Sequence, residues 1–286
     1  MVTLTEGFIE HRGHRVWWGA TANGGTPVLT VHGGPGICHD CLEPVAGLPR
    51  RVVFYDQYGC GRSDRAADPT AYDLDVFVSE IDAVRDGLGL DQVHLFAHSY
   101  GGPLALAYLL GAPAGVVSLT LTNSFASVPA LAAGWQERLA ELPAADAGVL
   151  RAGDQADPAY GPALGEFVRR FVYDGDLPEP VLRSMQNSGS EVYARMHGSS
   201  WFVPDGVLAG LDLTDRLGEI RVPTLAIGGR RDQCVPALAE AVAAGVPGAH
   251  LAILDGRHFP FYEEPDSYLA LVEDFMARAE ATAAQQ

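Results

Sequence analysis

Short runs of apolar residues recur along the chain and alternate with segments in which apolar residues have helical spacing. The apolar runs at 28–31, 51–56, 93–98, 116–121, 222–227 and 249–254 predict buried strands. Helical spacing over 72–88, 103–110, 236–244 and 266–280 predicts helices between or after them. Strands that are apolar throughout and alternate with helices are typical of a parallel sheet covered on both faces. The pattern therefore predicts an α/β fold, a mostly parallel sheet flanked by helices, with a hairpin over residues 7–20.

The alternation stops after about Asn123 and resumes near Val222. The intervening segment contains helical stretches, among them 131–142 and 167–173, and loops rich in Pro and Gly, but no clear strand. We therefore predict a discontinuous core, residues 1–123 and 216–286, with residues 124–215 inserted as a helical cap. The length of 286 residues and the hydrophobic content of 48% are sufficient for one sizeable core.

A sharp strand-to-helix turn is predicted around Ser99. The apolar run ends at this residue, two glycines follow, and a helix begins near Pro103. The sequence matches the pattern G-x-S-x-G with Ala97 in place of the first Gly; in that pattern a strained turn exposes a nucleophilic Ser above the sheet. The simpler alternative is an ordinary turn in which Ser99 caps the helix.

Polar residues follow several predicted strands, at the sheet edge where ligands bind in folds of this kind. Asp232 and His258 each follow a late strand, so that the chain order Ser, Asp, His is that of the α/β-hydrolase triad. His258 would take the proton of the Ser99 hydroxyl, and Asp232 would orient the imidazole and stabilise its positive charge. Asp232 could instead cap the helix that begins near Pro236. Other candidate acids are Asp212, Asp215 and Asp255, and other candidate bases are His32, His98 and His197.

Acyl transfer also requires N–H donors placed where the oxyanion develops. The N–H of Tyr100, directly after the proposed nucleophile, is one candidate. The glycine-rich loop at 32–36 supplies the other, which we assign to Gly34, and Gly33 of the same loop is expected to contact substrate. A position without a Cβ lets a substrate approach the backbone closely.

Charge and composition exclude several classes of function. With 36 acidic and 19 basic residues the formal net charge is −17, which disfavours nucleic acid and anionic membranes as partners. The basic residues are all Arg, so catalysis by a Lys Schiff base is excluded. No apolar stretch approaches the ~20 residues of a membrane span, and Met1–Glu10 lacks the pattern of a signal peptide. We expect a cytoplasmic protein, and nothing in the pattern points to a particular oligomeric state.

The four cysteines are expected to be reduced thiols. Cys38 and Cys41 flank a His-Asp pair and could suggest a metal or redox site. A second pair of ligands at zinc spacing is absent from the sequence, so small buried thiols are the better interpretation. The proposed chemistry requires neither a metal nor another cofactor.

The motifs together resemble the proline iminopeptidase family of α/β hydrolases. The resemblance rests on the segments 32–36, 56–63, 213–216, 220–225, 229–232 and 256–260 and on the Ser99 turn. It implies an acyl-enzyme mechanism and release of an N-terminal residue whose free amino group is held by two Glu. At the corresponding positions this chain has Trp201 and Gln233, with Glu191 and Asp205 as nearby acids. Gln can still accept a hydrogen bond, and Trp201 could line the pocket or serve only in cap packing.

The sequence therefore predicts a serine hydrolase without a cofactor, acting on an amide or ester bond of a small molecule or short peptide that is partly apolar. One possibility is an aminopeptidase or amino-acid amidase. Another is an esterase, lactonase or blocked-amide hydrolase that recognises no free amine, with a place in specialised metabolism. A third, from a different class, is a ligand-binding protein that uses the same fold without catalysis.

Overall fold

The computed structural model describes residues 3–284 and contains, within them, one eight-stranded sheet. The strand order is β1-β2-β4-β3-β5-β6-β7-β8. The strands are β1 (Thr5–His11), β2 (His14–Ala20), β3 (Val28–Val31), β4 (Val52–Tyr55), β5 (Val93–His98), β6 (Val116–Thr122), β7 (Thr224–Gly229) and β8 (His250–Leu254). The β1–β2 and β2–β4 pairs are antiparallel, and the remaining pairs are parallel. The predicted α/β fold with a mostly parallel sheet is confirmed.

The central strands are buried over their whole length because helices cover both faces of the sheet. Every residue of β3, β4, β5 and β7 is buried. The edge strand β8 departs from this pattern: it is partly exposed, and Leu251 is 44% accessible. An apolar run can thus predict a strand correctly while overstating how deeply it is buried.

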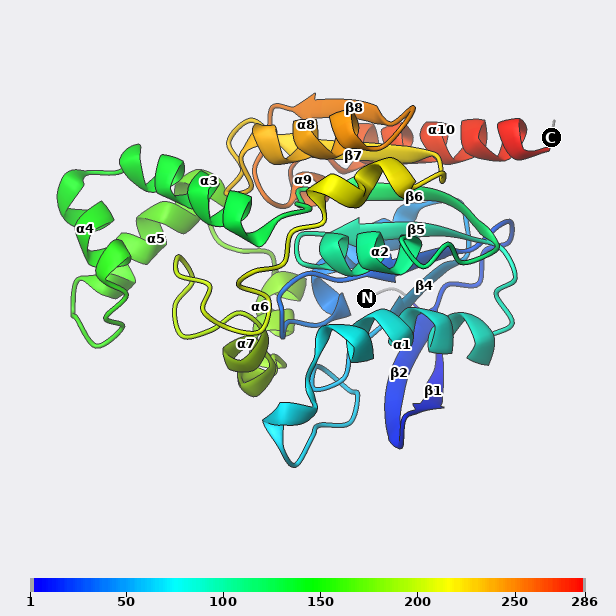
Figure 1. Cartoon of the computed structure of the whole chain (residues 1–286), viewed down its shortest axis with the longest axis horizontal. Coiled ribbons are helices and arrows are strands. Elements are labelled where there is room, and N and C mark those ends of the chain that lie inside the picture. The colour runs from blue at the N-terminus through cyan, green and yellow to red at the C-terminus, as the bar shows by residue number, and fades with distance from the viewer. Residues whose placement is uncertain (1–2, 285–286) are drawn as a thin grey trace.

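Helices lie on both faces of the sheet (Figure 1). Those of the core are α1 (Leu74–Gly87), α2 (Gly101–Leu109), α8 (Pro236–Gly245), α9 (Pro260–Glu263) and α10 (Pro265–Ala283), with the 3-10 helices η1 (His39–Gly47), η2 (Pro69–Ala71) and η3 (Thr214–Glu219). Helices α1, α2 and α8 cover one face, and α10 covers the other (Figure 1). In the described residues, no helix has both the length and the apolar character that a membrane crossing requires.

Between β6 and β7 the chain forms a helical segment at one end of the sheet (Figure 1). Its helices are α3 (Val128–Ala140), α4 (Ala144–Ala152), α5 (Tyr160–Phe171), α6 (Glu179–Gln186) and α7 (Ser190–Met196). Helix α3 begins where Ser127 caps it by accepting a hydrogen bond from the N–H of Ala130. We refer to residues 124–215 as the cap.

The end of α5 is joined to the core at both loops that carry the late polar residues. The carbonyl of Phe171 accepts the N–H of Gln233 at 2.9 Å, and the carbonyl of Val172 accepts the N–H of His258 at 3.1 Å. From α3, the Arg138 guanidinium donates to the carbonyl of Asp232 at 2.7 Å. The cap therefore helps to set the backbone from which two predicted site residues project.

Candidate active site

Ser99 lies in a strained turn between β5 and α2. It is one of few residues other than Gly with a positive φ, at 52°, a conformation that is unfavourable for a side chain with a Cβ. The turn closes only because its neighbours are small: a Cβ at Gly101 would lie 2.1 Å from the carbonyl oxygen of Val31. Helix α2 takes Tyr100 as its N-cap, so the alternative in which Ser99 caps the helix does not describe this turn.

Ser99, His258 and Asp232 form a continuous hydrogen-bonded chain. The Ser99 hydroxyl lies 3.1 Å from Nε2 of His258, to which it can donate its proton. Nδ1 of the same imidazole donates to Oδ1 of Asp232 at 2.8 Å. Asp232 is completely buried and does not cap α8, whose N-cap is Val235. This geometry can activate a hydroxyl as a nucleophile and stabilise the imidazolium that results.

The second oxygen of Asp232 is held by Asn123, which the sequence analysis did not single out. Nδ2 of Asn123 donates to Oδ2 of Asp232 at 2.7 Å and to the carbonyl of Arg257, also at 2.7 Å. Asn123 has a φ of 51° at the end of β6, a conformation that Asn tolerates better than most residues. The only sequence signal for it was a polar residue directly after a buried strand.

His98 supports the loop of His258. Its Nε2 donates to the carbonyl of His258 at 2.9 Å, and the two rings lie 4.7 Å apart. Burial, followed by the charge of His258, holds the pKa of His98 well below its ordinary value. His98 is therefore neutral with its proton on Nε2, and it acts as a spacer rather than as the base.

The two glycines of the loop at 32–36 have different positions. Gly34, like Tyr100, lines the cavity beside Ser99. Gly33 packs behind Ser99 instead, where a Cβ would lie 3.0 Å from the Ser99 Cβ, and it does not line the cavity. The expectation that Gly33 contacts substrate is therefore replaced by a packing role.

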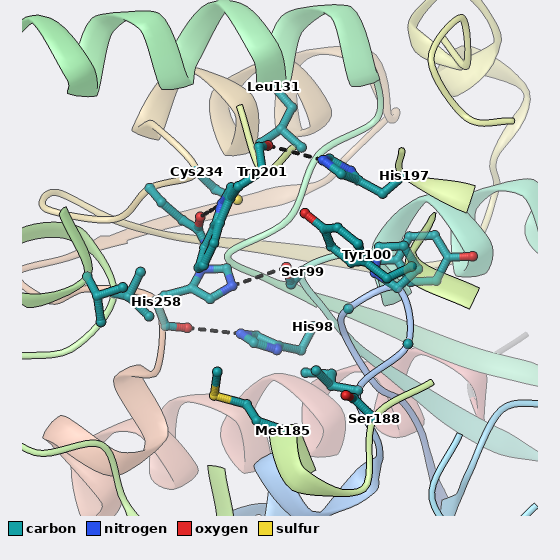
Figure 2. A pocket seen from close by; sticks show the side chains of 18 of the residues that line it. His98, Ser99, Tyr100, Leu131, Met185, Ser188, His197, Trp201, Cys234 and His258 are labelled. Carbon is teal, nitrogen blue, oxygen red and sulfur yellow. Dashed lines mark hydrogen bonds between the residues drawn. The ribbon is translucent and has the colours of Figure 1, made fainter. Parts of the chain in front are cut away.

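A cavity of about 470 Å³ lies between the sheet edge and the cap, with Ser99 and His258 in its wall. Figure 2 shows Ser99 near its middle, with Trp201 and His197 on one side and Met185 and Ser188 on the other. Its lining is mostly apolar and comes largely from the cap. Across residues 3–284, no Asp, Glu or Arg side chain lines it.

Trp201 and Gln233 both line this cavity and contact each other. Nε1 of the Trp201 indole donates to Oε1 of Gln233 at 3.0 Å. Trp201 also packs against Phe167 and Phe202, with ring centroids 6.2 Å and 6.1 Å away. Both side chains are uncharged, and the amide oxygen of Gln233 already accepts the hydrogen bond from the indole. This pair therefore has little capacity to neutralise a cation.

The two acids considered as replacements lie outside the cavity. Glu191 and Asp205 are both exposed, and Asp205 accepts hydrogen bonds from the N–H and hydroxyl of Ser199. Glu191 lies in the first turn of α7, whose buried side consists of Val192 and Met196, and its own side chain is exposed. The prediction that Glu191 binds substrate is therefore not supported by its position.

Several of the other candidate acids and bases have structural partners. Asp212 accepts the N–H of Thr214, and Asp255 is exposed with Arg231 3.5 Å away. His32 accepts the N–H of Gln57 through Nε2, and its burial lowers its pKa to about 4. Among the other candidate bases, His197 lines the cavity, but its Nε2 donates to the carbonyls of Ser200 and Trp201.

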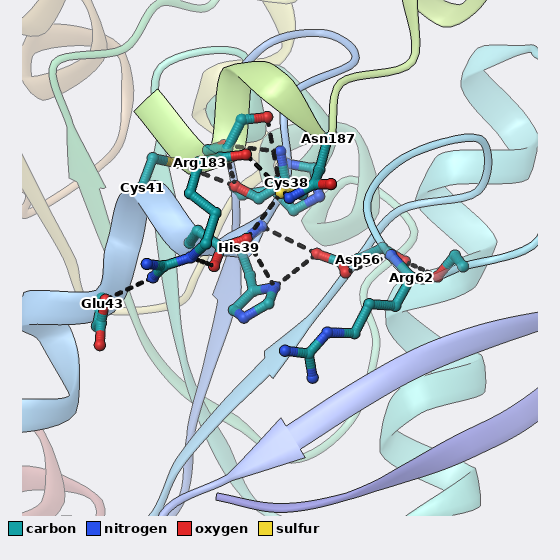
Figure 3. A network of polar contacts seen from close by, with 12 residues as sticks. Cys38, His39, Cys41, Glu43, Asp56, Arg62, Arg183 and Asn187 are labelled. Atoms are coloured by element: carbon teal, nitrogen blue, oxygen red, sulfur yellow. Dashed lines mark hydrogen bonds and ion pairs between the residues drawn. The ribbon is translucent and has the colours of Figure 1, made fainter. Parts of the chain in front are cut away.

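Two groups of buried side chains contain the residue types that bind metals. One consists of Asp232, Cys234 and His258, and the other of Cys38, His39 and Asp56. In the second group Asp56 already accepts hydrogen bonds from His39 and from the N–H of Arg62, and the Cys38 thiol donates to Asp40 (Figure 3). These hydrogen bonds account for the clustering without an ion.

Comparisons with known proteins identify relatives of this chain. The family model described as alpha/beta hydrolase fold matches residues 26–265. A proline iminopeptidase of Heyndrickxia coagulans is 35% identical over 284 residues, covering 95% of this chain and 98% of that protein. The structure of a proline iminopeptidase from Mycobacterium smegmatis is similar at a TM-score of 0.91 and 28% identity, over 98% of this chain and 100% of that one. The structure of VinJ is similar at a TM-score of 0.91 and 27% identity, over 96% of this chain and 99% of that one.

Proposed function

The chain belongs to the proline iminopeptidase family of α/β hydrolases, and from this premise we propose that it is a serine hydrolase acting through an acyl-enzyme. Its substrate is an ester or amide whose acyl group is small and partly apolar. The observation that supports this most strongly is the chain of contacts from Asp232 through His258 to Ser99, which ends at an apolar cavity.

The reaction follows from what each group can do. His258 takes the proton of Ser99 as Oγ attacks the substrate carbonyl, and Asp232 stabilises the imidazolium. The N–H groups of Tyr100 and Gly34 stabilise the oxyanion, which develops where donors are already fixed. His258 then protonates the leaving group, and the same sequence with water as the nucleophile releases the acid.

The cavity supports a substrate that has no charged amine next to the scissile bond. A buried ammonium without a counter-charge costs several kcal/mol, and none of the described residues places a carboxylate in the lining. The indole of Trp201 instead offers an apolar face worth up to a few kcal/mol for a group that covers it. We therefore expect the enzyme to prefer a blocked or absent amine.

The test compares matched substrates with a free and an acetylated amine. We expect kcat/KM for N-acetyl-alanyl or N-acetyl-prolyl 4-nitroanilide to be at least equal to that of the free-amine form. Trp201→Glu combined with Gln233→Glu should shift the ratio toward the free amine, because it introduces two carboxylates. Ser99→Ala is the control that identifies background hydrolysis.

A second candidate, an aminopeptidase, is favoured by one observation: the Heyndrickxia coagulans relative described above is called a proline iminopeptidase. A preference of about 100-fold for the free amine, or about 2.7 kcal/mol at about 1.36 kcal/mol per decade, would establish this candidate. In that case the amine would have to be held by backbone carbonyls or by the face of Trp201.

A further inference from the structure

The nucleophile divides the cavity into two lobes of different character. On one side of Ser99 lie Leu131, Trp201, His197 and Cys234, and on the other lie Met185 and Ser188 (Figure 2). A hydrolase must place the two halves of its substrate on either side of the scissile carbonyl. The properties of each lobe therefore indicate which half it holds.

The lobe beside Trp201 is enclosed. Leu131, His197 and Cys234 are all buried, as are the neighbouring lining residues Val128 and Trp135. Trp201 is partly accessible, and its indole is fixed by the hydrogen bond to Gln233. This lobe fits a compact group with little freedom to extend.

The lobe beside Met185 reaches the surface. Met185 lines the cavity and is also 48% accessible, so the cavity meets solvent at this side chain. Leu177, Val181 and Met185 recur at every fourth position before and along α6 and all line the cavity.

Val181 and Met185 lie on one side of α6, because residues four apart share a face, and Leu177 lies just before the helix. Leu177 is half-buried and Met185 is exposed, so an apolar chain lying against them would bury them further.

We propose that the leaving group of the substrate carries an extended apolar chain that lies in the Met185 lobe, while the compact acyl group occupies the lobe beside Trp201. This inference rests on the proposed acyl-enzyme function. After Ser99 Oγ bonds to the acyl carbon, the bond to the leaving oxygen or nitrogen breaks, and His258 supplies its proton. That product must depart before water enters, and the Met185 lobe, which meets solvent, gives it a way out.

The test uses pairs of ester isomers that contain the same atoms. Octyl acetate and ethyl octanoate differ only in whether the chain is on the leaving group or on the acyl group. We expect kcat/KM to rise about two- to fourfold per added methylene in a series of alkyl acetates, up to about eight carbons. The isomeric series of ethyl esters should stay flat or decline, leaving octyl acetate at least tenfold better than ethyl octanoate.

Two variants on one helix provide the matched control. Met185→Glu puts a charge at the mouth of the lobe and should lower the octyl-to-ethyl ratio of the acetates at least tenfold. Leu182→Glu adds the same charge on α6 at a residue that is 42% accessible but does not line the cavity. It should leave that ratio within twofold of the unmodified protein.

The inference is overturned if the ethyl ester series rises instead, if both series are flat, or if Leu182→Glu and Met185→Glu change the ratio equally. These results differ from a failure of the proposed function, in which no ester or amide shows turnover that depends on Ser99. Circular dichroism of both variants would confirm that each is folded.

Discussion

Two buried His–Asp pairs in the described part of the chain have almost the same geometry. In one, Nδ1 of His258 lies 2.8 Å from Oδ1 of Asp232, and in the other, Nδ1 of His39 lies 2.7 Å from Oδ1 of Asp56. Each pair has a buried cysteine nearby, Cys234 or Cys38. Asp56 directly follows a strand, and Asp232 lies shortly after one. Burial, distance and residue type therefore do not distinguish the two pairs.

The difference lies in what surrounds each pair. His258 has the Ser99 hydroxyl on its other nitrogen and a cavity beside it. The His39 ring packs on Trp17, with centroids 4.3 Å apart, and does not line that cavity. The Asp56 carboxylate already accepts hydrogen bonds from the N–H groups of His39 and Arg62 and from the His39 ring (Figure 3). In the mechanism that we propose, a His–Asp pair becomes reactive through a third partner, here the Ser99 hydroxyl, and through access to substrate.

Electrostatics fit a structural role for Asp56. Burial alone would raise its pKa, but the charge of His39 and its hydrogen bonds outweigh burial and leave the pKa lowered. The carboxylate is thus held in its ionised form. It fixes the turn that begins η1 next to the glycine-rich loop.

The largest expected effect is on kcat, and it should distinguish the His258 pair from the His39 pair. Ser99→Ala should lower kcat by roughly 10⁶-fold, and His258→Ala should have a similar effect that adds little to it, because residues of a triad act as a unit. His39→Gln should leave kcat of the folded protein within about tenfold. The measurement is turnover of a 4-nitrophenyl ester. Equal losses in His258→Ala and His39→Gln would contradict the distinction.

The next effect concerns stability. Asp56→Asn removes a buried charge that several donors require, so the free energy of unfolding should fall by about 2–5 kcal/mol. Urea denaturation monitored by tryptophan fluorescence measures it, and the remaining folded protein should keep most of its kcat. A variant with full stability and no activity would instead assign Asp56 to the chemistry.

A third buried pair, His14 and Glu80, should make the stability of the protein depend on pH. Nε2 of His14 lies 3.4 Å from Oε1 of the completely buried Glu80, and burial, only partly offset by His14, raises the Glu80 pKa to about 7. The folded state thus binds this proton more tightly than the unfolded chain, where the ordinary value is 4.5. Stability should therefore fall between about pH 4.5 and 7, by about 3 kcal/mol relative to Glu80→Gln.

Glu80→Gln keeps an oxygen that can accept the N–H of Tyr58, so the comparison isolates the charge. The measurement is urea denaturation of both proteins at several pH values. Parallel stability curves for the two proteins would show that Glu80 is not protonated more readily in the folded state.

The smallest expected effect on activity concerns the hydrogen bond that Asn123 donates to Asp232. Asn123→Gly keeps the positive φ but removes the donor to Asp232 Oδ2. A hydrogen bond to a charged group contributes about 1.5–3 kcal/mol, so kcat/KM should fall about 10- to 100-fold. Because Asn123 does not line the cavity, the loss should fall on kcat and leave KM nearly unchanged. An unchanged kcat, or a loss confined to KM, would contradict this role.

The strands of the core, and the proximity of Ser99, Asp232 and His258, could be predicted because they depend on local pattern. Apolar runs mark the strands, and Ser99, Asp232 and His258 follow strand ends that converge at one edge of the sheet. The role of Asn123 was not predicted, because it depends on two partners more than a hundred residues away. Contacts between such distant residues leave no periodic pattern in the sequence.

The cap was predicted less well. The segments expected at 131–142 and 167–173 correspond to α3 and α5, which begin at Val128 and Tyr160, and α4, α6 and α7 were not resolved individually. Short helices gain most of their stability from packing, so their own sequences define them weakly. The prediction that Glu191 binds substrate has the same weakness, because the helices and loops around α7 decide which face of that helix is buried.

The most direct test of the account is labelling with a fluorophosphonate, which reacts with an activated serine. Intact-mass and peptide analysis should find a single adduct on Ser99, absent in Ser99→Ala, formed far more slowly in His258→Ala and at an unchanged rate in His39→Gln. An adduct on another residue, or no adduct on the folded protein, would contradict the claim that only the His258 pair activates a nucleophile.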